Sequence, residues 1–522
     1  MNARKSIPLL VLAAVIICVF VNSDLPSVNN MEARNYVTAR EILQDGSWLL
    51  PTMNGELRIA KPPLPTWITA AFMRLSGTDA RLDVNRIPAG MAGALLALFT
   101  FLLVRRITGN SGLALTAVLV LITTQLFLWS VRRNFWDIYA HAAMAGAVWA
   151  MAEVFARGNN RGRYLLIFTL LMAVSFLSKG PVALWAPFIP FLATYCLTIG
   201  TSDLRANALG LLCAIGIAAL LSASWPLYVY LNAPHDAVAV AAKESSNWFS
   251  YHVEAPWYYL KNLHWVSGLW LFFLLYAIVA LFAEKDWKKE EKLFVLWFII
   301  TLVLLSVIPE KKVRYLLPAL VPAAAASAIA IHRLRQSGGW AWKLVYGLFC
   351  IVSGAAFLGA AAAMALHSSG KLTVLAGTLV IATWGAVVIA SLFARRTRHT
   401  HLVVASGICL CLVLITPVKG QLLGRDGTLD LMALREISEI RERELFYLGD
   451  PPMELVWAAG RRVRAVDTPG AGSFPPPSPG TALIATRALD PQDPGMRLVR
   501  TIETEDDTYY VYCVLQERAK SD

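Results

Sequence analysis

Residues 29–36 read NNMEARNY, and residues 61–67 read KPPLPTW. Both stretches lie in the polar segment 23–85, which separates the first two apolar stretches of the chain. Long ordered loops are uncommon, and at a membrane surface they usually carry a function. Segment 23–85 therefore predicts a loop that contributes to a site at one face of a membrane protein.

The composition places the chain among multi-span membrane proteins. Of its 522 residues, 57% are hydrophobic and 16% are charged, which is too apolar for a soluble enzyme. Apolar stretches of about 17–25 residues recur, and each is long enough to cross the hydrocarbon core of a bilayer. We predict an α-helical polytopic fold of thirteen spans, near residues 7–22, 86–104, 111–129, 138–156, 164–177, 181–199, 207–231, 264–283, 292–308, 315–332, 340–366, 371–394 and 401–418.

The net charge and the cysteines do not change the assignment to multi-span membrane proteins. A charge of +12 could indicate nucleic-acid binding. In a polytopic protein it more often reflects basic cytoplasmic loops, so we expect no nucleic-acid partner. Six of the seven cysteines lie in apolar stretches and Cys513 lies alone in the polar tail, so the sequence implies no disulfide framework.

Basic residues alternate between the loops as the positive-inside rule predicts. With the N-terminus on the cytoplasmic side, the predicted cytoplasmic loops carry arginine or lysine near residues 105–106, 157–163, 205, 285–292, 333–335 and 395–398. An odd number of spans then places the C-terminal tail on the opposite side. The first span is alternatively a cleaved signal peptide, which would leave the rest of the topology unchanged.

Six basic residues break this rule because they fall on the side away from the cytoplasm. They are Arg132, Arg133, Lys179, Lys311, Lys312 and Arg314. Snorkelling toward lipid head groups explains an isolated cation of this kind. Several cations on the same side as segment 23–85 suggest instead an anionic ligand, for which a phosphate is the natural candidate.

Other chemistry-bearing residues share that side. Asp137 lies at the mouth of the fourth span, and Lys179 lies in a tight break between two short spans. Residues 309–318 bring three cations and the phenol of Tyr315 into one turn.

The segment 232–263 holds Glu244 and His252 among several aromatic residues. An aromatic belt suits a segment that lies along the lipid head groups. A lone interfacial histidine is more often structural than a ligand, so His252 alone carries little weight.

The first loop predicts a capped helix. Asn29 or Asn30 can cap a helix that runs to about Gln44 and stops at Gly46. Its partly apolar stripe predicts that it lies on the membrane or on top of the bundle. Glu32 falls in the first turn, where the helix dipole favours an ionised carboxylate. Whether Glu32 serves only the helix terminus or also a reaction stays open.

Lys61 begins the proline-rich part of the same loop. Pro62, Pro63 and Pro65 each remove a backbone donor, so this part is not regular helix throughout. A lysine before such a rigid turn has little conformational freedom, as suits a phosphate-binding cation.

With these motifs in place, the chain resembles the membrane glycosyltransferases of the C-type fold. Within that group it is most similar to the bacterial aminoarabinose lipid A transferases and their relatives of the protein O-mannosyltransferase type. The matching motifs, spread over roughly residues 1–335, lie at residues 32–36, 61–63, 137, 178–181, 252–259 and 314–318. The family usually opens the first motif with Asp-Glu. This chain has Met31-Glu32, so Glu32 is the only carboxylate of that motif.

The resemblance implies transfer of a sugar from a polyprenyl-phosphate donor to lipid A or another lipid, glycan or protein acceptor. It places the reaction at the periplasmic face of a bacterial inner membrane. It implies that Lys61, Arg314 and Tyr315 stabilise the leaving phosphate, and that Glu32 or Asp137 is the general base for a hydroxyl acceptor. A phosphate acceptor would need no base. The remaining substrate-binding candidates are Arg34, Tyr36, Lys179, Glu244, His252 and Lys311.

Two other classes of membrane protein share parts of this pattern. A transporter or flippase for a lipid-linked sugar would carry ionisable groups inside its spans, where His141 and Glu153 are the obvious examples. An O-antigen ligase or polymerase would share the topology. Polar chemistry gathers at one face of this chain, which favours an interfacial enzyme. No histidine and carboxylate cluster has the spacing of a metal site, so we predict no cofactor and leave a divalent metal open.

The composition changes after the transmembrane domain 1–418. Residues 419–522 predict a small soluble α/β domain on the periplasmic side, with a charged helix at 430–444. Strands are predicted at residues 462–467, 482–487, 498–504 and 508–516. Its role as a lid, an acceptor-docking domain or a structural support stays open.

Overall fold

The computed structural model describes residues 3–24, 26–156, 160–235, 238, 252–366, 372–393, 400–414, 431–466, 480–489, 496–504 and 507–515. The chain folds into two compact units. The helical unit combines Met1–Ser23, Ile59–Pro65 and Arg86–Pro417, and the loop–tail unit combines Asp24–Arg58, Thr66–Asn85 and Val418–Asp522. The sequence separated only the tail, near residue 418. In the structure most of the first loop folds with the tail, whereas the Lys61 turn belongs to the helical unit.

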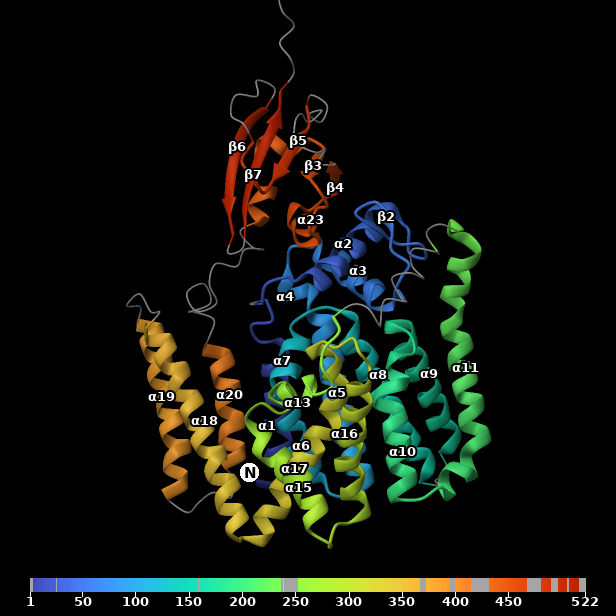
Figure 1. Cartoon of the computed structure of the whole chain (residues 1–522), viewed down its shortest axis with the longest axis vertical. Helices are drawn as coiled ribbons and strands as arrows, with labels where there is room; N and C mark the ends of the chain where they lie inside the picture. Colours follow the sequence, from blue (N-terminus) through green and yellow to red (C-terminus); the bar gives the residue numbers. More distant parts are fainter. Residues whose placement is uncertain are drawn as a thin grey trace, which may run out of the picture. The chain divides into compact units, whose positions relative to one another are not determined.

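Helices build the helical unit, and most of them run side by side (Figure 1). They are α1 (Ala3–Phe20), α5 (Ile87–Thr108), α6 (Ser111–Ile122), α7 (Gln125–Val131), α8 (Trp136–Phe155), α9 (Arg161–Lys179), α10 (Ile189–Thr198), α11 (Ser202–Asn232), α13 (Tyr258–Lys261), α14 (Leu263–Ser267), α15 (Leu271–Ala283), α16 (Lys289–Val307), α17 (Leu320–Ser337), α18 (Trp340–Leu366), α19 (Leu372–Phe393) and α20 (Thr400–Leu414). Short helical turns at Leu184–Phe188, Gly268–Trp270 and Val313–Ala319 lead into α10, α15 and α17.

The predicted class of polytopic helical membrane protein agrees with this unit. Within the described residues, seven helices are long and apolar enough to cross a membrane. The number becomes eight if the pair α6 and α7, bent by 69°, is taken as one span. Each of the thirteen predicted stretches overlaps helical structure. The full count of thirteen spans is not reached by length and composition alone.

The helix α8 lies at the centre of this unit, between α5 and α9, and most of its length is buried. Its close fit depends on Gly146. A Cβ atom at this position would lie 2.6 Å from Phe99 of α5 and 2.8 Å from Leu171 of α9, closer than atoms can pack. Small residues at such crossings let helix backbones approach closely in a membrane. The packing places the start of α8 beside the end of α9, because the two helices run in opposite directions.

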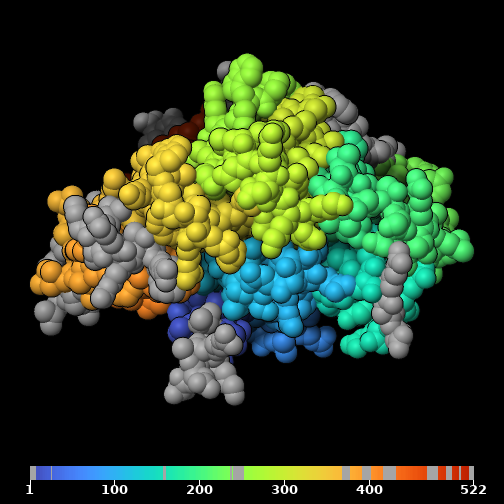
Figure 2. Space-filling view, turned by 90° about the horizontal axis from the view of Figure 1, so that it is seen from below, coloured from blue at the N-terminus to red at the C-terminus, as the bar shows by residue number. Residues whose placement is uncertain are grey.

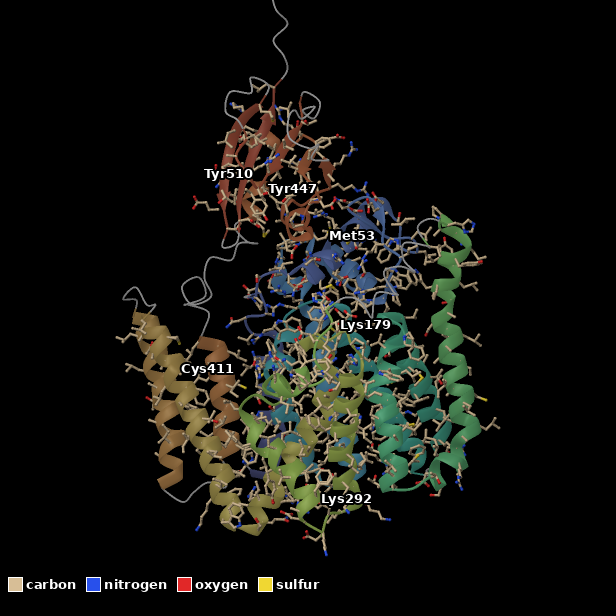
Figure 3. The ribbon with its side chains drawn as sticks, in the orientation of Figure 1. Met53, Lys179, Lys292, Cys411, Tyr447 and Tyr510 are labelled. Carbon is tan, nitrogen blue, oxygen red and sulfur yellow. The ribbon has the colours of Figure 1, made fainter. Side chains whose placement is uncertain are left out.

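Lys179 and Lys292 lie at opposite ends of the helical unit (Figure 3). The alternation of basic loops predicted that these two lysines lie on opposite sides of the membrane. Figure 2 views the molecule from the end at which Lys292 lies, where segments from the blue, green, yellow and orange parts of the sequence meet.

The loop–tail unit begins with the first loop. It contains α2 (Asn30–Asp45), the short strands β1 (Thr52–Met53) and β2 (Glu56–Leu57), α3 (Leu64–Ser76) and α4 (Leu82–Asn85). The predicted caps of α2 are confirmed. The Asn29 side chain accepts a hydrogen bond from Glu32 N at 3.0 Å, and Gly46 ends the helix with φ of 73°.

The tail forms a five-stranded mixed sheet with the strand order β4-β3-β5-β7-β6. Its strands are β3 (Leu445–Leu448), β4 (Val463–Val466), β5 (Ala482–Ala485), β6 (Met496–Glu503) and β7 (Thr508–Val514). β3 pairs in parallel with β4 and β5, and β7 pairs antiparallel with β5 and β6. The helix α23 (Met453–Ala459) connects β3 to β4. Four of the strands were predicted, and β3 and α23 were not.

The prediction of a charged helix at 430–444 was wrong. This segment forms two 3₁₀ turns, Met432–Arg435 and Ser438–Ile440. Its buried apolar residues recur every three positions, at Leu431, Leu434, Ile437 and Ile440. A spacing of three aligns side chains along a 3₁₀ turn rather than an α-helix, so burial of these four side chains outweighs helix propensity.

The apolar stripe of α2 is buried in this unit against the tail, a partner that the sequence did not predict. Tyr36, Val37 and Ile42 belong to one hydrophobic core with Leu455 and Trp457 of α23. α2 and α23 lie side by side (Figure 1). The tail therefore supplies the surface that covers the apolar side of α2.

Candidate active site

Asp137 and Lys179 form an ion pair in the helical unit. Asp137 lies in the first turn of α8 and Lys179 is the last residue of α9, so each charge complements the dipole of its own helix. The Ser175 hydroxyl of α9 donates to the Ala140 carbonyl of α8 at 2.8 Å and fixes the register of the two helices. The side chains of Asp137 and Lys179 are only 2% and 12% exposed.

The ring of Tyr315 lies among three cations. Its centroid is 5.2 Å from Lys179 Nζ, 5.5 Å from the Arg314 guanidinium carbon and 6.0 Å from Lys312 Nζ. The Tyr315 hydroxyl donates to Glu310 Oε1 at 3.0 Å, and Lys312 pairs with the same carboxylate at 2.9 Å. Arg314 also acts electrostatically on Asp137. The predicted residues Asp137, Lys179, Arg314 and Tyr315 are thus brought together.

Lys61 reaches the same region through Trp136, the residue before Asp137. Its Nζ lies 5.1 Å from the centroid of the Trp136 ring. Lys61 is half-buried and Trp136 is buried. A cation over an indole ring gains electrostatic attraction, so Trp136 helps to fix the predicted phosphate-binding lysine.

The charges of this cluster do not balance. Lys61, Lys179, Lys312 and Arg314 supply four cations, whereas Asp137 and Glu310 supply two carboxylates. Trp136 Nε1 and Arg314 Nε are buried and have no hydrogen-bond partner among the described residues. Buried donors normally have partners, so a positively charged cluster with unused donors is suited to an anionic ligand.

Lys311 has a structural environment. Its buried ammonium donates to the carbonyl oxygens of Ile308, Glu254 and Pro309 at 2.7, 3.0 and 3.4 Å. The backbone N–H of Lys311 donates to the His252 carbonyl at 3.1 Å. Lys311 therefore joins the segment after residue 251 to the loop before Val313.

Of the other two candidates in the segment 232–263, the structure describes His252 but not Glu244. His252 has an exposed side chain and a positive φ of 51°. Glu244 lies outside the described residues.

Two of the remaining cations that were predicted to lie away from the cytoplasm also contact protein groups in the helical unit. Arg132 donates to the Val21 carbonyl at 3.0 Å, and Arg133 lies over the Trp129 ring at 5.0 Å. Neither of these contacts requires a ligand.

Glu32, Arg34 and Tyr36 lie on α2 in the loop–tail unit. The Tyr36 hydroxyl donates to Glu32 Oε1 at 2.9 Å, and both side chains are fully buried. Arg34 is half-buried and lies near Glu454 of α23. Burial raises the pKa of Glu454, and the positive charge of Arg34 partly opposes that rise.

Comparison with known proteins agrees with this fold and these motifs. Residues 60–228 match the family described as dolichyl-phosphate-mannose-protein mannosyltransferase. An uncharacterized protein of Aquifex aeolicus is 28% identical over 320 residues, which are 60% of this chain and 61% of the relative. The undecaprenyl phosphate-alpha-4-amino-4-deoxy-L-arabinose arabinosyl transferase of Pectobacterium atrosepticum is 26% identical over 393 residues, which are 70% of this chain and 67% of the relative. The chain therefore spans about two thirds or less of the length of these relatives.

Among solved structures, ArnT from Cupriavidus metallidurans bound to undecaprenyl phosphate shares the fold. The TM-score is 0.74 at 17% identity, with 98% of each chain covered. The apo form of the same protein gives a TM-score of 0.72 at 16% identity. The chain shares the fold of ArnT and is similar in sequence to the arabinosyl transferases.

These similarities bear on one of the alternatives left open by the sequence. The Pectobacterium relative and the matching family model are named as transferases rather than transporters, so the transporter class is not favoured. Within the described residues, no three side chains of His, Cys, Asp or Glu gather in a way that could hold a metal ion.

Sequence reasoning missed Trp136 and Glu310 as members of the cluster. Trp136 stands directly before Asp137, and Glu310 stands within the basic turn that was singled out, so both were adjacent to predicted residues. The role of Trp136 depends on Lys61, which is distant in the sequence and left no local signal. Glu310 contacts Tyr315 only five residues further along the chain, so this local pair could have been predicted.

Proposed function

We propose that this chain is a glycosyltransferase that moves a sugar from a polyprenyl-phosphate donor to a lipid or glycan acceptor at the membrane face away from the cytoplasm. The observation that carries the proposal is the cluster around Asp137, Lys179 and Tyr315, with its excess of positive charge and its unused buried donors. The undecaprenyl phosphate in the name of the Pectobacterium relative and in the Cupriavidus structure supports a lipid-phosphate donor.

The donor phosphate is bound by the cations of the helical unit. In the reaction, the bond between the anomeric carbon and the phosphate oxygen breaks, and the phosphate keeps the electron pair. Lys61, Lys179 and Arg314 stabilise the negative charge that develops on this leaving group. Tyr315 keeps Lys179 and Arg314 beside its ring, because a cation is attracted to the face of an aromatic ring.

Asp137 acts as a positioning residue in this proposal and not as the base. Its carboxylate already accepts a hydrogen bond from Lys179, and a carboxylate engaged with an ammonium is a weaker proton acceptor. The ion pair holds the Lys179 ammonium at the N-terminus of α8.

Glu32 is the proposed general base for a hydroxyl acceptor. It takes the proton as the acceptor oxygen forms the new bond to the anomeric carbon. A phosphate acceptor is already ionised and attacks without a base, so dependence on Glu32 distinguishes the two acceptor classes.

Arg34 is proposed to contact the acceptor beside Glu32, with Tyr36 orienting the carboxylate. We assign Lys311 and His252 to the loop structure described above, and Glu244 stays a sequence-based candidate.

The orientation follows from the charge pattern. In the proposed topology of thirteen spans, with the basic loops in the cytoplasm, the Lys179 end of the bundle and the tail after residue 418 lie in the periplasm of a bacterial cell. The opposite positions of Lys179 and Lys292 support this topology (Figure 3).

Mass spectrometry of lipid A, glycolipids and surface glycans tests the activity in cells. Cells with the wild-type chain should contain a glycosylated product that is absent from cells without it and from cells with Lys179→Ala at equal expression. A product pattern that is unchanged by deletion of the chain would overturn the proposal. Purified protein with labelled undecaprenyl-phosphate sugars then identifies the donor.

A further inference from the structure

Glu32 and Tyr36 form a pair on one side of α2. They stand one helical turn apart, so the hydrogen bond from the Tyr36 hydroxyl to the Glu32 carboxylate stays within the helix. Because both side chains are fully buried, no water layer separates them from their neighbours. The Tyr36 hydroxyl therefore helps to hold the bonded oxygen of Glu32 in place.

Trp457 of α23 packs against the Tyr36 ring. The ring centroids are 6.2 Å apart and the ring planes are tilted by 37°. This separation lies within the usual range of favourable aromatic pairs. Trp457 is fully buried and is one of the largest side chains in the core shared by α2 and the tail. The indole of Trp457 therefore restricts the position of the Tyr36 ring by packing against it.

Trp457 is itself fixed by polar contacts. Its Nε1 donates to the Asp79 carbonyl at 3.2 Å. The Asp79 carboxylate pairs with Arg40 of α2 at 2.9 Å and with Arg435 at 2.7 Å. Both arginines also donate to the Trp457 carbonyl. The first loop and the tail are therefore tied together at Trp457.

We propose that the C-terminal tail positions the Glu32 carboxylate through Trp457 and Tyr36, so that Trp457 is a positioning residue for sugar transfer. This inference rests on the proposed function of Glu32. A general base must hold its oxygen in a defined place, and a displacement of about 1 Å can cost roughly 100-fold in rate. The donor phosphate is assigned to cations of the helical unit, so loss of Trp457 changes turnover rather than donor binding.

Kinetics of the full-length enzyme in detergent test this inference. Trp457→Leu removes the ring, and we expect kcat to fall by about 10- to 100-fold while the donor KM stays within about twofold. Trp457→Phe keeps an aromatic ring against Tyr36 and should recover most of kcat. Tyr36→Phe keeps the ring packing but removes the hydroxyl, so it should lower kcat with little change in melting temperature.

Ile484→Ala is the matched control. Ile484 is fully buried in β5, within the same hydrophobic core, but it lies on the sheet rather than on α23. It should lower the melting temperature and leave kcat near the wild-type value. If Ile484→Ala lowers kcat as much as Trp457→Leu does at an equal loss of melting temperature, the role of Trp457 is structural and the inference is overturned.

Glu32→Gln separates this inference from the function on which it rests. Full activity of Glu32→Gln removes the base from the proposed function. Loss of activity in Glu32→Gln together with normal kcat in Tyr36→Phe and Trp457→Leu overturns only the positioning role. If Trp457→Leu does not fold, Trp457→Phe and Tyr36→Phe still decide the question, because normal kcat in Tyr36→Phe contradicts the inference.

Discussion

Asp137 at the start of α8 and Lys179 at the end of α9 form an ion pair that is almost completely removed from solvent. Such a pair gains little net stability from being buried, because both ions lose their hydration. The loss of one partner is costly, since the other charge then stays buried alone. A pair of this kind at the centre of the cationic cluster indicates that the ammonium is needed there.

Asp137→Asn should therefore abolish transfer and lower the melting temperature of the purified protein. Removing one partner of a buried pair typically costs about 3–5 kcal/mol. The double variant Asp137→Asn with Lys179→Met should recover stability but not activity, because it removes the unpaired charge and also the cation that binds phosphate. An active double variant would exclude Lys179 from the reaction.

Trp136→Phe should weaken donor binding specifically. The phenylalanine keeps a ring beneath Lys61 but lacks the buried N–H, which has no hydrogen-bond partner among the described residues. If that N–H donates to the charged donor phosphate, its loss should raise the donor KM by about 10-fold, with kcat nearly unchanged.

Trp129→Phe provides the control for this measurement. Trp129 belongs to α7 and packs against Phe135 and Arg133 rather than against Lys61. An equal rise in KM for both variants would show that Trp136 has no specific contact with the donor.

Lys311 and Lys61 should behave in opposite ways when each is changed to methionine. Lys311→Met removes the ammonium that donates to three backbone carbonyls, so the melting temperature should fall while the donor KM stays near the wild-type value. Lys61→Met should raise the donor KM by about 10-fold or more with little change in melting temperature. A raised KM and an unchanged melting temperature in Lys311→Met would return Lys311 to the phosphate-binding set.

Local signals in the sequence were enough to place α2 and the charged helix ends. The caps of α2 are set by Asn29 and Gly46, which act on their own neighbours in the chain. Asp137 and Lys179 could be selected because each stands at the end of an apolar stretch. Their pairing follows from the antiparallel packing of consecutive helices, which the order of the spans already favours.

Contacts between distant parts of the chain could not be predicted in this way. Lys311 and Lys312 are adjacent and chemically alike, yet the fold directs Lys311 to backbone carbonyls and Lys312 to Glu310. The packing of Trp457 on Tyr36 joins the two ends of the sequence. Because the sequence does not show this contact, the apolar stripe of α2 predicted a helix on a membrane surface. An apolar stripe indicates that one side of a helix is covered, but not by which part of the protein.

The stability of the loop–tail unit should fall at acid pH through Asp79. Burial alone would raise the pKa of Asp79, but the hydrogen bonds and charges of Arg435 and Arg40 outweigh burial and lower the pKa below its ordinary value. A carboxylate with a lowered pKa in the folded state stabilises that state above the ordinary pKa, near 4, and this stabilisation is lost as the pH falls through the lowered value.

The melting temperature of the wild-type chain should therefore drop more steeply below about pH 4 than that of Asp79→Asn, which lacks the titrating group. Asp83→Asn is the control, since Asp83 pairs with Arg81 at an exposed position and should change the profile little. Parallel profiles for the wild type and Asp79→Asn would show that the two arginines do not depend on the charge of Asp79.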